Sequence, residues 1–246
     1  MLMTEMEWLA CGGTVSLCEE LRFGPSKRKL RLFAAACLRR VWPLLGHEAT
    51  RLAVEACEQY ADDLISRDEL LELWTNGELD ADEHLWLGPE SSWGCDCECC
   101  SGGTRDPREE AEQMLRRVRD GEANPAWTAA KAVFHARDLV AWQAEPPERT
   151  AAAEQERQAQ YLLLLDLFGG SATPGRIDPL FLIWNDRTIP RLARSMYHSG
   201  NFDQLPILAD ALEDAGCADA GVLSHCRGPG PHVRGCWVVD LLLGKS

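Results

Sequence analysis

Apolar residues recur at helical spacing along most of this chain, and no stretch alternates apolar and polar residues over the length of a convincing strand. The clearest case follows Ser26. Its apolar face consists of Leu30, Phe33, Cys37 and Val41. Residues 48–60 repeat the pattern and are expected to form an antiparallel partner helix. The periodicity predicts an all-α protein, either an irregular multi-helix bundle or an array of short helical hairpins.

Capping residues and helix breakers divide this pattern. Ser66 and Glu69 have the spacing of a capping box, and Gly169-Gly170 should end a helix that begins near Glu148. Shorter helices are expected to begin near Asp178, Thr188, Leu205, Asp219 and His232, and the last is expected to run to Leu243. We therefore expect an N-terminal helical region (residues 1–75), a long acidic Cys-rich loop or insertion (76–105), central helices (106–170) and a C-terminal short-helix region (171–246).

Negative charge is concentrated in the middle of the chain. The formal net charge is −14, and residues 61–123 hold eighteen Asp and Glu residues against six Arg residues. An acidic chain repels phosphate, so we expect no nucleic-acid binding. A protein partner with a basic surface fits this charge better. The basic face of residues 26–42 allows an anion-binding or membrane-surface helix, although a solvated face of a packed helix gives the same pattern.

Two absences bear on the compartment. No apolar run approaches the roughly 20 residues that cross a bilayer, and the acidic N-terminus does not resemble a secretion signal. A cytoplasmic protein without membrane contact is therefore expected. The eleven Cys residues are then expected to be reduced thiols, not a disulfide framework.

The first candidate site is a group of four thiols within six residues. It comprises Cys95, Cys97, Cys99 and Cys100. Thiolates suit zinc or Cu(I), but the spacing is not the Cys-x₂-Cys of a zinc knuckle. Asp96 and Glu98 would also make the neighbouring thiols harder to ionise. The alternative is a loop that binds no metal.

The second candidate site lies in the tail, around a Gly/Pro turn. Its members are His225, Cys226, His232 and Cys236. Neutral imidazole and thiolate are zinc ligands, and four such groups can close a tetrahedral site. On a helix, His232 and Cys236 would share one face, whereas adjacent His225 and Cys226 would need a turn to reach one ion. The alternative is structural, with His225 at a helix end and both thiols in the core.

Other chemistry has weaker support in the sequence. A tail Cys with a tail His has the residue types of a nucleophile and its base, yet no nucleophile-elbow signature accompanies them. We therefore assign no catalytic residue and do not expect an enzyme. Arg227 and Arg234 could grip an anion, although a rigid turn that docks the last helix explains them equally.

Two blocks of the sequence resemble an uncharacterised bacterial protein family of unknown function. They are residues 4–11 with 26–40, and residues 178–186 continuing to 245. The resemblance covers about half the chain, implies no activity, and leaves the Cys-rich middle as a variable part. Separately, Leu208–Gly216 is similar to a helix of short repeat-companion domains, which implies an interaction role.

Taken together, these observations favour a non-catalytic helical interaction or adaptor protein that needs no cofactor. The alternative is a protein with a structural zinc ion in the tail or in the Cys-rich loop. A Cys-dependent enzyme is the third possibility.

Overall fold

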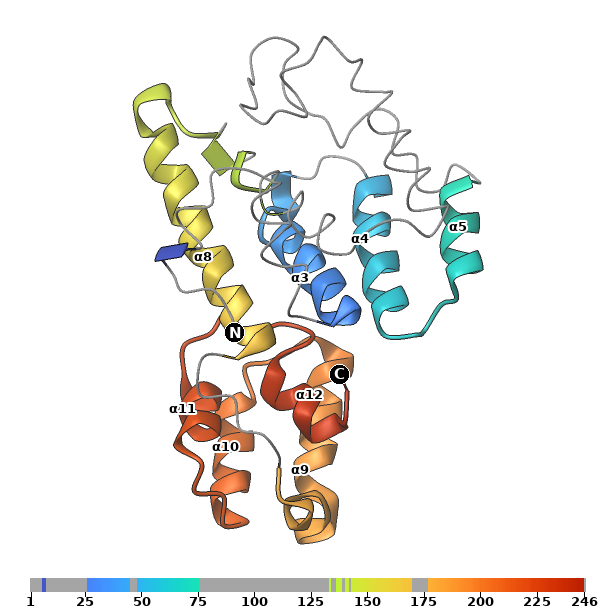
Figure 1. Ribbon diagram of the computed structural model, residues 1–246, viewed down its shortest axis with the longest axis vertical. Coiled ribbons are helices and arrows are strands. Elements are labelled where there is room, and N and C mark those ends of the chain that lie inside the picture. The colour runs from blue at the N-terminus through green and yellow to red at the C-terminus, as the bar shows by residue number, and fades with distance from the viewer. Residues whose placement is uncertain are drawn as a thin grey trace. The chain divides into compact units, whose positions relative to one another are not determined.

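The computed structural model describes residues 26–44, 48–75, 143–169 and 177–245, together with 6–7, 133, 136–138 and 140–141. Throughout these residues regular structure is helical and no strand occurs, which confirms the all-α class (Figure 1). The helices are α3 (Lys27–Arg40), η1 (Trp42–Leu44), α4 (Glu48–Ala61), α5 (Arg67–Thr75), η2 (Pro146–Glu148), α8 (Arg149–Phe168), α9 (Pro179–Ser199), α10 (Leu205–Asp214), α11 (Ala220–Arg227) and α12 (Trp237–Leu243). The Cys-rich loop expected at residues 76–105 lies outside the described part.

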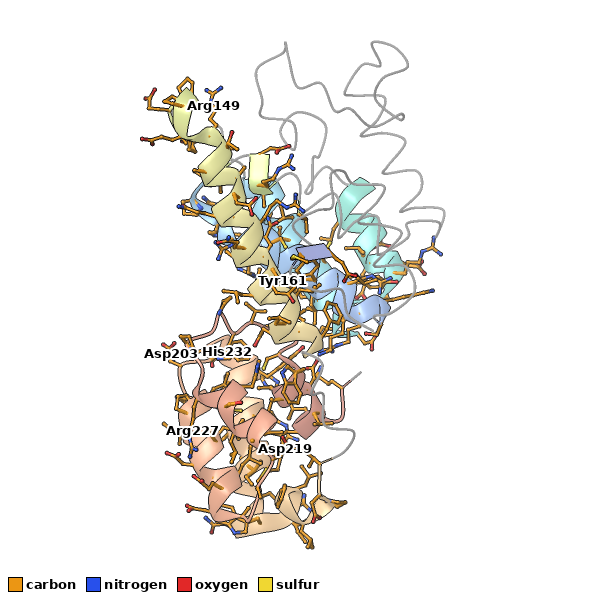
Figure 2. The ribbon with its side chains drawn as sticks, turned by 60° about the vertical axis from the view of Figure 1, so that its left-hand side comes forward. Arg149, Tyr161, Asp203, Asp219, Arg227 and His232 are labelled. Atoms are coloured by element: carbon orange, nitrogen blue, oxygen red, sulfur yellow. The ribbon has the colours of Figure 1, made fainter. Side chains whose placement is uncertain are left out.

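The chain folds into two compact units, and the division falls within α8. The N-terminal unit lies within Met3–Gln160, and the C-terminal unit contains the chain from Tyr161 onwards. Arg149 and Tyr161 lie along this helix, before and just after the division (Figure 2). The finer four-part organisation expected from the sequence stays a prediction.

The N-terminal unit is built on the predicted pairing of α3 with α4. Ser26 caps α3, because its Oγ accepts a hydrogen bond of 3.1 Å from the Lys29 amide. Phe33 and Cys37 are completely buried, so the apolar face predicted from the sequence is confirmed. The capping box is also confirmed: Ser66 Oγ accepts from the Glu69 amide at 3.1 Å, and the Glu69 carboxylate accepts from the Ser66 amide at 2.7 Å.

Arginines of α3 are neutralised by specific carboxylates. Arg39 binds both oxygens of Glu58, and Arg40 binds both oxygens of Glu156 at 2.9 Å. Bidentate pairs of this kind use the donor groups that an anion would need. The anion-binding interpretation of this helix face therefore loses its support.

The C-terminal unit contains the last residues of α8 and helices α9 to α12, and α9 to α12 pack around one apolar core. Fully buried members of this core include Ile189, Ala193, Leu205, Leu208, Leu212, Cys226, Cys236, Val238 and Val239. Burying a side chain of leucine size contributes about 2 kcal/mol. The break predicted between helices at Asp178 and Thr188 is present, because Trp184–Arg187 have non-helical backbone angles within α9.

The last helix is shorter than predicted. The sequence pattern places its start at His232, whereas α12 begins at Trp237. Gly235 has a φ of 94° and Cys236 has a ψ of 128°, so the backbone is not helical directly before Trp237. His232 and Cys236 therefore do not share a helix face, and that premise of the sequence analysis is wrong.

Among the described helices, none combines the length and apolar character that a membrane span requires.

Replacing Glu156 by Gln should lower the free energy of unfolding by about 1–3 kcal/mol, because the Arg40 guanidinium loses its charged, nearly buried partner. Glu154→Gln is the matched control, since Glu154 lies on the same helix but is exposed. It should change the free energy by less than about 0.5 kcal/mol. Urea unfolding of both variants measures the difference, and equal losses would contradict a stabilising role for the pair.

Candidate metal centre

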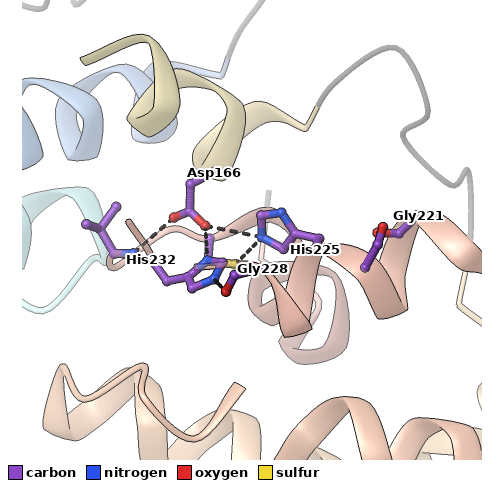
Figure 3. A network of polar contacts seen from close by, with 8 residues as sticks. Asp166, Gly221, His225, Gly228 and His232 are labelled. Carbon is purple, nitrogen blue, oxygen red and sulfur yellow. Dashed lines mark hydrogen bonds and ion pairs between the residues drawn. The ribbon is translucent and has the colours of Figure 1, made fainter. Parts of the chain in front are cut away.

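Four side chains of the C-terminal unit meet at one point (Figure 3). Asp166 belongs to the last turn of α8, His225 to α11, and His232 and Cys236 to the segment between α11 and α12. One ligand atom from each side chain can be chosen so that all four lie within 4.8 Å of one another. The group could therefore hold a metal ion.

Asp166 is the centre of the contacts. Its Oδ1 lies 2.7 Å from His232 Nδ1 and 3.2 Å from His225 Nε2. Its Oδ2 accepts a hydrogen bond of 2.9 Å from the Val233 amide. The side chain is 2% exposed, so both oxygens are satisfied inside the protein.

His225 is held on α11, which begins where Asp219 Oδ1 accepts from the Val222 amide at 3.0 Å. The ring stands edge-on to the His232 ring at a centroid distance of 4.9 Å and contacts the Trp237 ring at 5.1 Å. Its Nε2 lies 3.2 Å from Cys236 Sγ as well as near Asp166. His225 Nε2 therefore lies between Asp166 and Cys236, inside the four-residue group.

His232 uses its two nitrogens differently. Nδ1 faces Asp166, and Nε2 lies 3.4 Å from the carbonyl oxygen of Gly228 (Figure 3). The second distance is long for a hydrogen bond, yet it directs Nε2 away from the other three side chains. His232 therefore presents Nδ1 to the group.

At Asp166 and His232, burial and the neighbouring polar groups shift the pKa in opposite directions. Burial raises the pKa of Asp166, but hydrogen bonds from His225 and His232 outweigh it and leave that pKa below its ordinary value. Burial lowers the pKa of His232, but the hydrogen bond and charge of Asp166 outweigh it and leave that pKa raised. The carboxylate is therefore ionised and attracts positive charge into the group.

Cys236 is completely buried and lies directly before α12. Burial raises the pKa of its thiol well above the ordinary value, the charge of Asp166 adds to this, and the amides of Val239 and Val238 act in the opposite direction. A protonated thiol is a poor nucleophile and a poor ligand. A nearby cation would stabilise the thiolate further.

The measured separations can be compared with those of a tetrahedral zinc site. Zinc–nitrogen and zinc–oxygen bonds of about 2.1 Å and a zinc–sulfur bond of about 2.3 Å place ligand atoms about 3.3–3.6 Å apart. Asp166 Oδ1 and Cys236 Sγ each lie 3.2 Å from His225 Nε2. The Asp166–His232 separation of 2.7 Å is shorter, because it is a hydrogen-bond distance. Other pairs of ligand atoms are separated by up to 4.8 Å, so the side chains would have to move closer to a common centre to form a coordination shell.

The structure brings together three of the four tail residues proposed from the sequence, namely His225, His232 and Cys236. Cys226 is not in the group. It is completely buried in the apolar core, and burial together with the charge of Asp166 raises its pKa to about 12. Consecutive helical residues point about 100° apart, so α11 can direct only His225 to the group. The other candidates, Cys95, Cys97, Cys99 and Cys100, lie outside the described residues.

Sequence reasoning missed Asp166. It is the one charged residue in the apolar run of residues 161–168 at the end of α8. A carboxylate there must be paired or bound to a cation when it is buried. That signal marks Asp166 as a candidate, although it does not identify the partners.

The contacts do not form a catalytic relay. In such a relay one imidazole nitrogen faces the nucleophile and the other faces the acid. Here the same atom, His225 Nε2, faces both Cys236 and Asp166. Because the Cys236 thiol is also completely buried, a substrate has no access to it.

An anion site formed by Arg227 and Arg234, which the sequence allowed but did not favour, can be compared with their contacts. Arg227 binds Asp210 at 2.8 Å and Glu213 at 2.5 Å on the surface. Arg234 instead lies over the Tyr197 ring, 5.5 Å from its centroid. The two guanidinium groups therefore have different neighbours, and the structure does not support one anion site that uses both.

Comparison with protein families, with curated proteins and with solved structures finds no match to this chain. The description of the site accordingly depends on its own geometry.

Cys236 should resist alkylation by iodoacetamide near neutral pH in the native protein, because its thiol is buried and its pKa is raised. Cys226 is the control, since it is equally buried and its pKa is also raised. Peptide mass spectrometry should find both thiols modified only after denaturation. Rapid modification of native Cys236 alone would instead support a reactive cysteine and an enzyme.

Proposed function

We propose that this protein binds one zinc ion through Asp166, His225, His232 and Cys236, and that the ion stabilises the fold of the C-terminal unit. The observation that carries this proposal is the approach of four potential ligand atoms to within 4.8 Å of one another. The four residues come from three separate parts of the chain, so helix periodicity does not account for their convergence.

The donor set favours zinc over harder cations. Mg²⁺ and Ca²⁺ prefer shells of oxygen ligands, whereas this group has one carboxylate, two imidazoles and one thiol. Zinc accepts oxygen, nitrogen and sulfur ligands in tetrahedral sites. Zinc would also stabilise the thiolate form of Cys236, which burial disfavours.

Contacts behind the ligands support the same function. Metal-bound histidines usually donate their second ring N–H to a carbonyl or carboxylate, and bound carboxylates are usually hydrogen-bonded as well. His232 Nε2 faces the Gly228 carbonyl, and Asp166 Oδ2 accepts from the Val233 amide. Asp166 Oδ1 and His232 Nδ1 are then the atoms directed at the ion.

A structural role follows from the number of ligands. Four protein ligands complete a tetrahedral shell, whereas catalytic zinc sites keep one position for water or substrate. Helices α11 and α12 have eight and seven residues and would be marginal by themselves. An ion that joins both to the end of α8 would hold them in place. An interaction role, expected from the sequence, is compatible with such a structural ion and stays a prediction.

Metal content gives the direct test. Protein purified without an affinity tag should contain about one zinc ion per chain by elemental analysis, as the one four-ligand group found among the described residues implies. Cys236→Ser should lose the ion, because the hydroxyl that replaces the thiolate is a far weaker ligand. Cys226→Ser should retain it, although both thiols are completely buried. Full zinc content in Cys236→Ser, or no zinc in the unaltered protein, would contradict the proposal.

Removing the ion should destabilise the C-terminal unit. A ligand present at about 100 times its dissociation constant stabilises a folded state by about 3 kcal/mol, and a chelator should abolish this contribution. Thermal unfolding with and without the chelator measures the effect, and Asp166→Asn serves as the reference. The chelator should have no effect on that variant. Equal shifts in both proteins would mean that the ion binds elsewhere.

A further inference from the structure

The turn formed by residues 228–231 contacts both histidines of the group through its backbone. The Gly228 amide donates to the His225 carbonyl at 3.1 Å, which closes α11 after Arg227. The Gly228 carbonyl lies 3.4 Å from Nε2 of the second histidine, His232. Gly228 thus contacts the backbone of His225 and the ring of His232 (Figure 3).

Gly228 and Gly230 are packed so closely that a side chain at either position would require its neighbours to move. A Cβ on Gly230 would lie 3.0 Å from the His232 backbone nitrogen and 3.3 Å from its ring carbon Cδ2. A Cβ on Gly228 would lie 3.2 Å from the His225 carbonyl oxygen. The turn is therefore packed directly against the proposed ligands, and a methyl group at residue 230 would displace the His232 backbone and ring.

We infer that this turn controls metal loading by fixing which nitrogen of His232 binds the ion. Nδ1 is the ligand atom, and Nε2 carries the proton and faces the Gly228 carbonyl. His225 binds through the opposite nitrogen, Nε2. Gly230 is a positioning residue, because its lack of a side chain lets the backbone approach the His232 ring. This inference rests on the proposed zinc function.

The geometry gives three independent reasons for this assignment. Asp166 Oδ1 lies 2.7 Å from Nδ1, so that nitrogen is inside the group. Nε2 has the Gly228 carbonyl as its neighbour, so it is directed out of the group. Rotating the ring to exchange the nitrogens would move its atoms in the confined space beside Gly230, where Cδ2 already lies close to the glycine.

Gly230→Ala tests the positioning role, and Gly200→Ala is the matched control. Both glycines have positive φ values, 79° and 68°, so alanine introduces backbone strain at each, and the strain is larger at residue 230 because Pro231 follows it. They differ in surroundings, because a Cβ at Gly200 would have no heavy atom within 4 Å. A difference in metal affinity between the variants therefore reports the local surroundings of residue 230, namely the contact with His232 and the restriction from Pro231, and the NMR measurement below tests the His232 nitrogen directly.

Competition with a chromogenic zinc chelator measures the affinity of each protein. Gly230→Ala should bind zinc about 10–100-fold more weakly than the unaltered protein, the range typical when a residue that orients a ligand is changed. Gly200→Ala should bind it as the unaltered protein does. Equal affinity of the two variants would overturn the positioning role of Gly230 and leave the zinc site intact. Absence of zinc binding in the unaltered protein would instead overturn the proposed function itself.

A second measurement does not depend on the folding of any variant. Long-range proton–nitrogen NMR spectra of the zinc-loaded protein, labelled with ¹⁵N-histidine, reveal which nitrogen of each ring carries a proton. His232 should be protonated at Nε2 and His225 at Nδ1. A proton on Nδ1 of His232 would overturn the inference even if the affinity results agree with it.

Discussion

The carboxylate of Asp166 imposes the main constraint on the C-terminal unit. An ionised group that is 2% exposed costs several kcal/mol unless partners compensate for the lost water. Its compensation comes from two histidine rings and one backbone amide on different parts of the tail. Because each partner must reach the same two oxygens, this one residue constrains where α11 and the segment that follows it lie.

The positions of the short helices α11 and α12 depend on polar contacts such as those of Asp166. Helices α11 and α12 each make only about two turns, and isolated helices of this length are marginal. Apolar residues hold them in the core, but apolar packing by itself tolerates several arrangements. Polar contacts with defined directions select one arrangement, and the close approach of Gly230 to His232 further restricts it.

The two units neutralise buried charge in different ways. In the N-terminal unit Glu58 and Glu156 each have their own arginine, which forms a bidentate pair. In the C-terminal unit one carboxylate serves two imidazoles, and a buried thiol lies beside one of them. The first arrangement leaves no oxygen for an ion. The second gathers oxygen, nitrogen and sulfur atoms around one point, which is what a metal site requires.

The sequence by itself determined the local structure. The α3 and α4 helices, the Ser66–Glu69 capping box and the start of α11 after Asp219 follow from neighbouring residues, because helix spacing and caps are short-range properties. The same local reasoning extended the last helix back to His232, since apolar spacing did not reveal the turn at Gly235 and Cys236.

Only the tertiary structure decided which chemical groups meet. His232 and Asp166 are 66 residues apart, and no local pattern relates them. The tail sequence suggested four ligands, namely His225, Cys226, His232 and Cys236. The orientation of α11 places Cys226 in the apolar core and not in the group. The orientation of α11 in the core and the path of the segment before α12 decide the membership of the group, because they determine which of these side chains face Asp166.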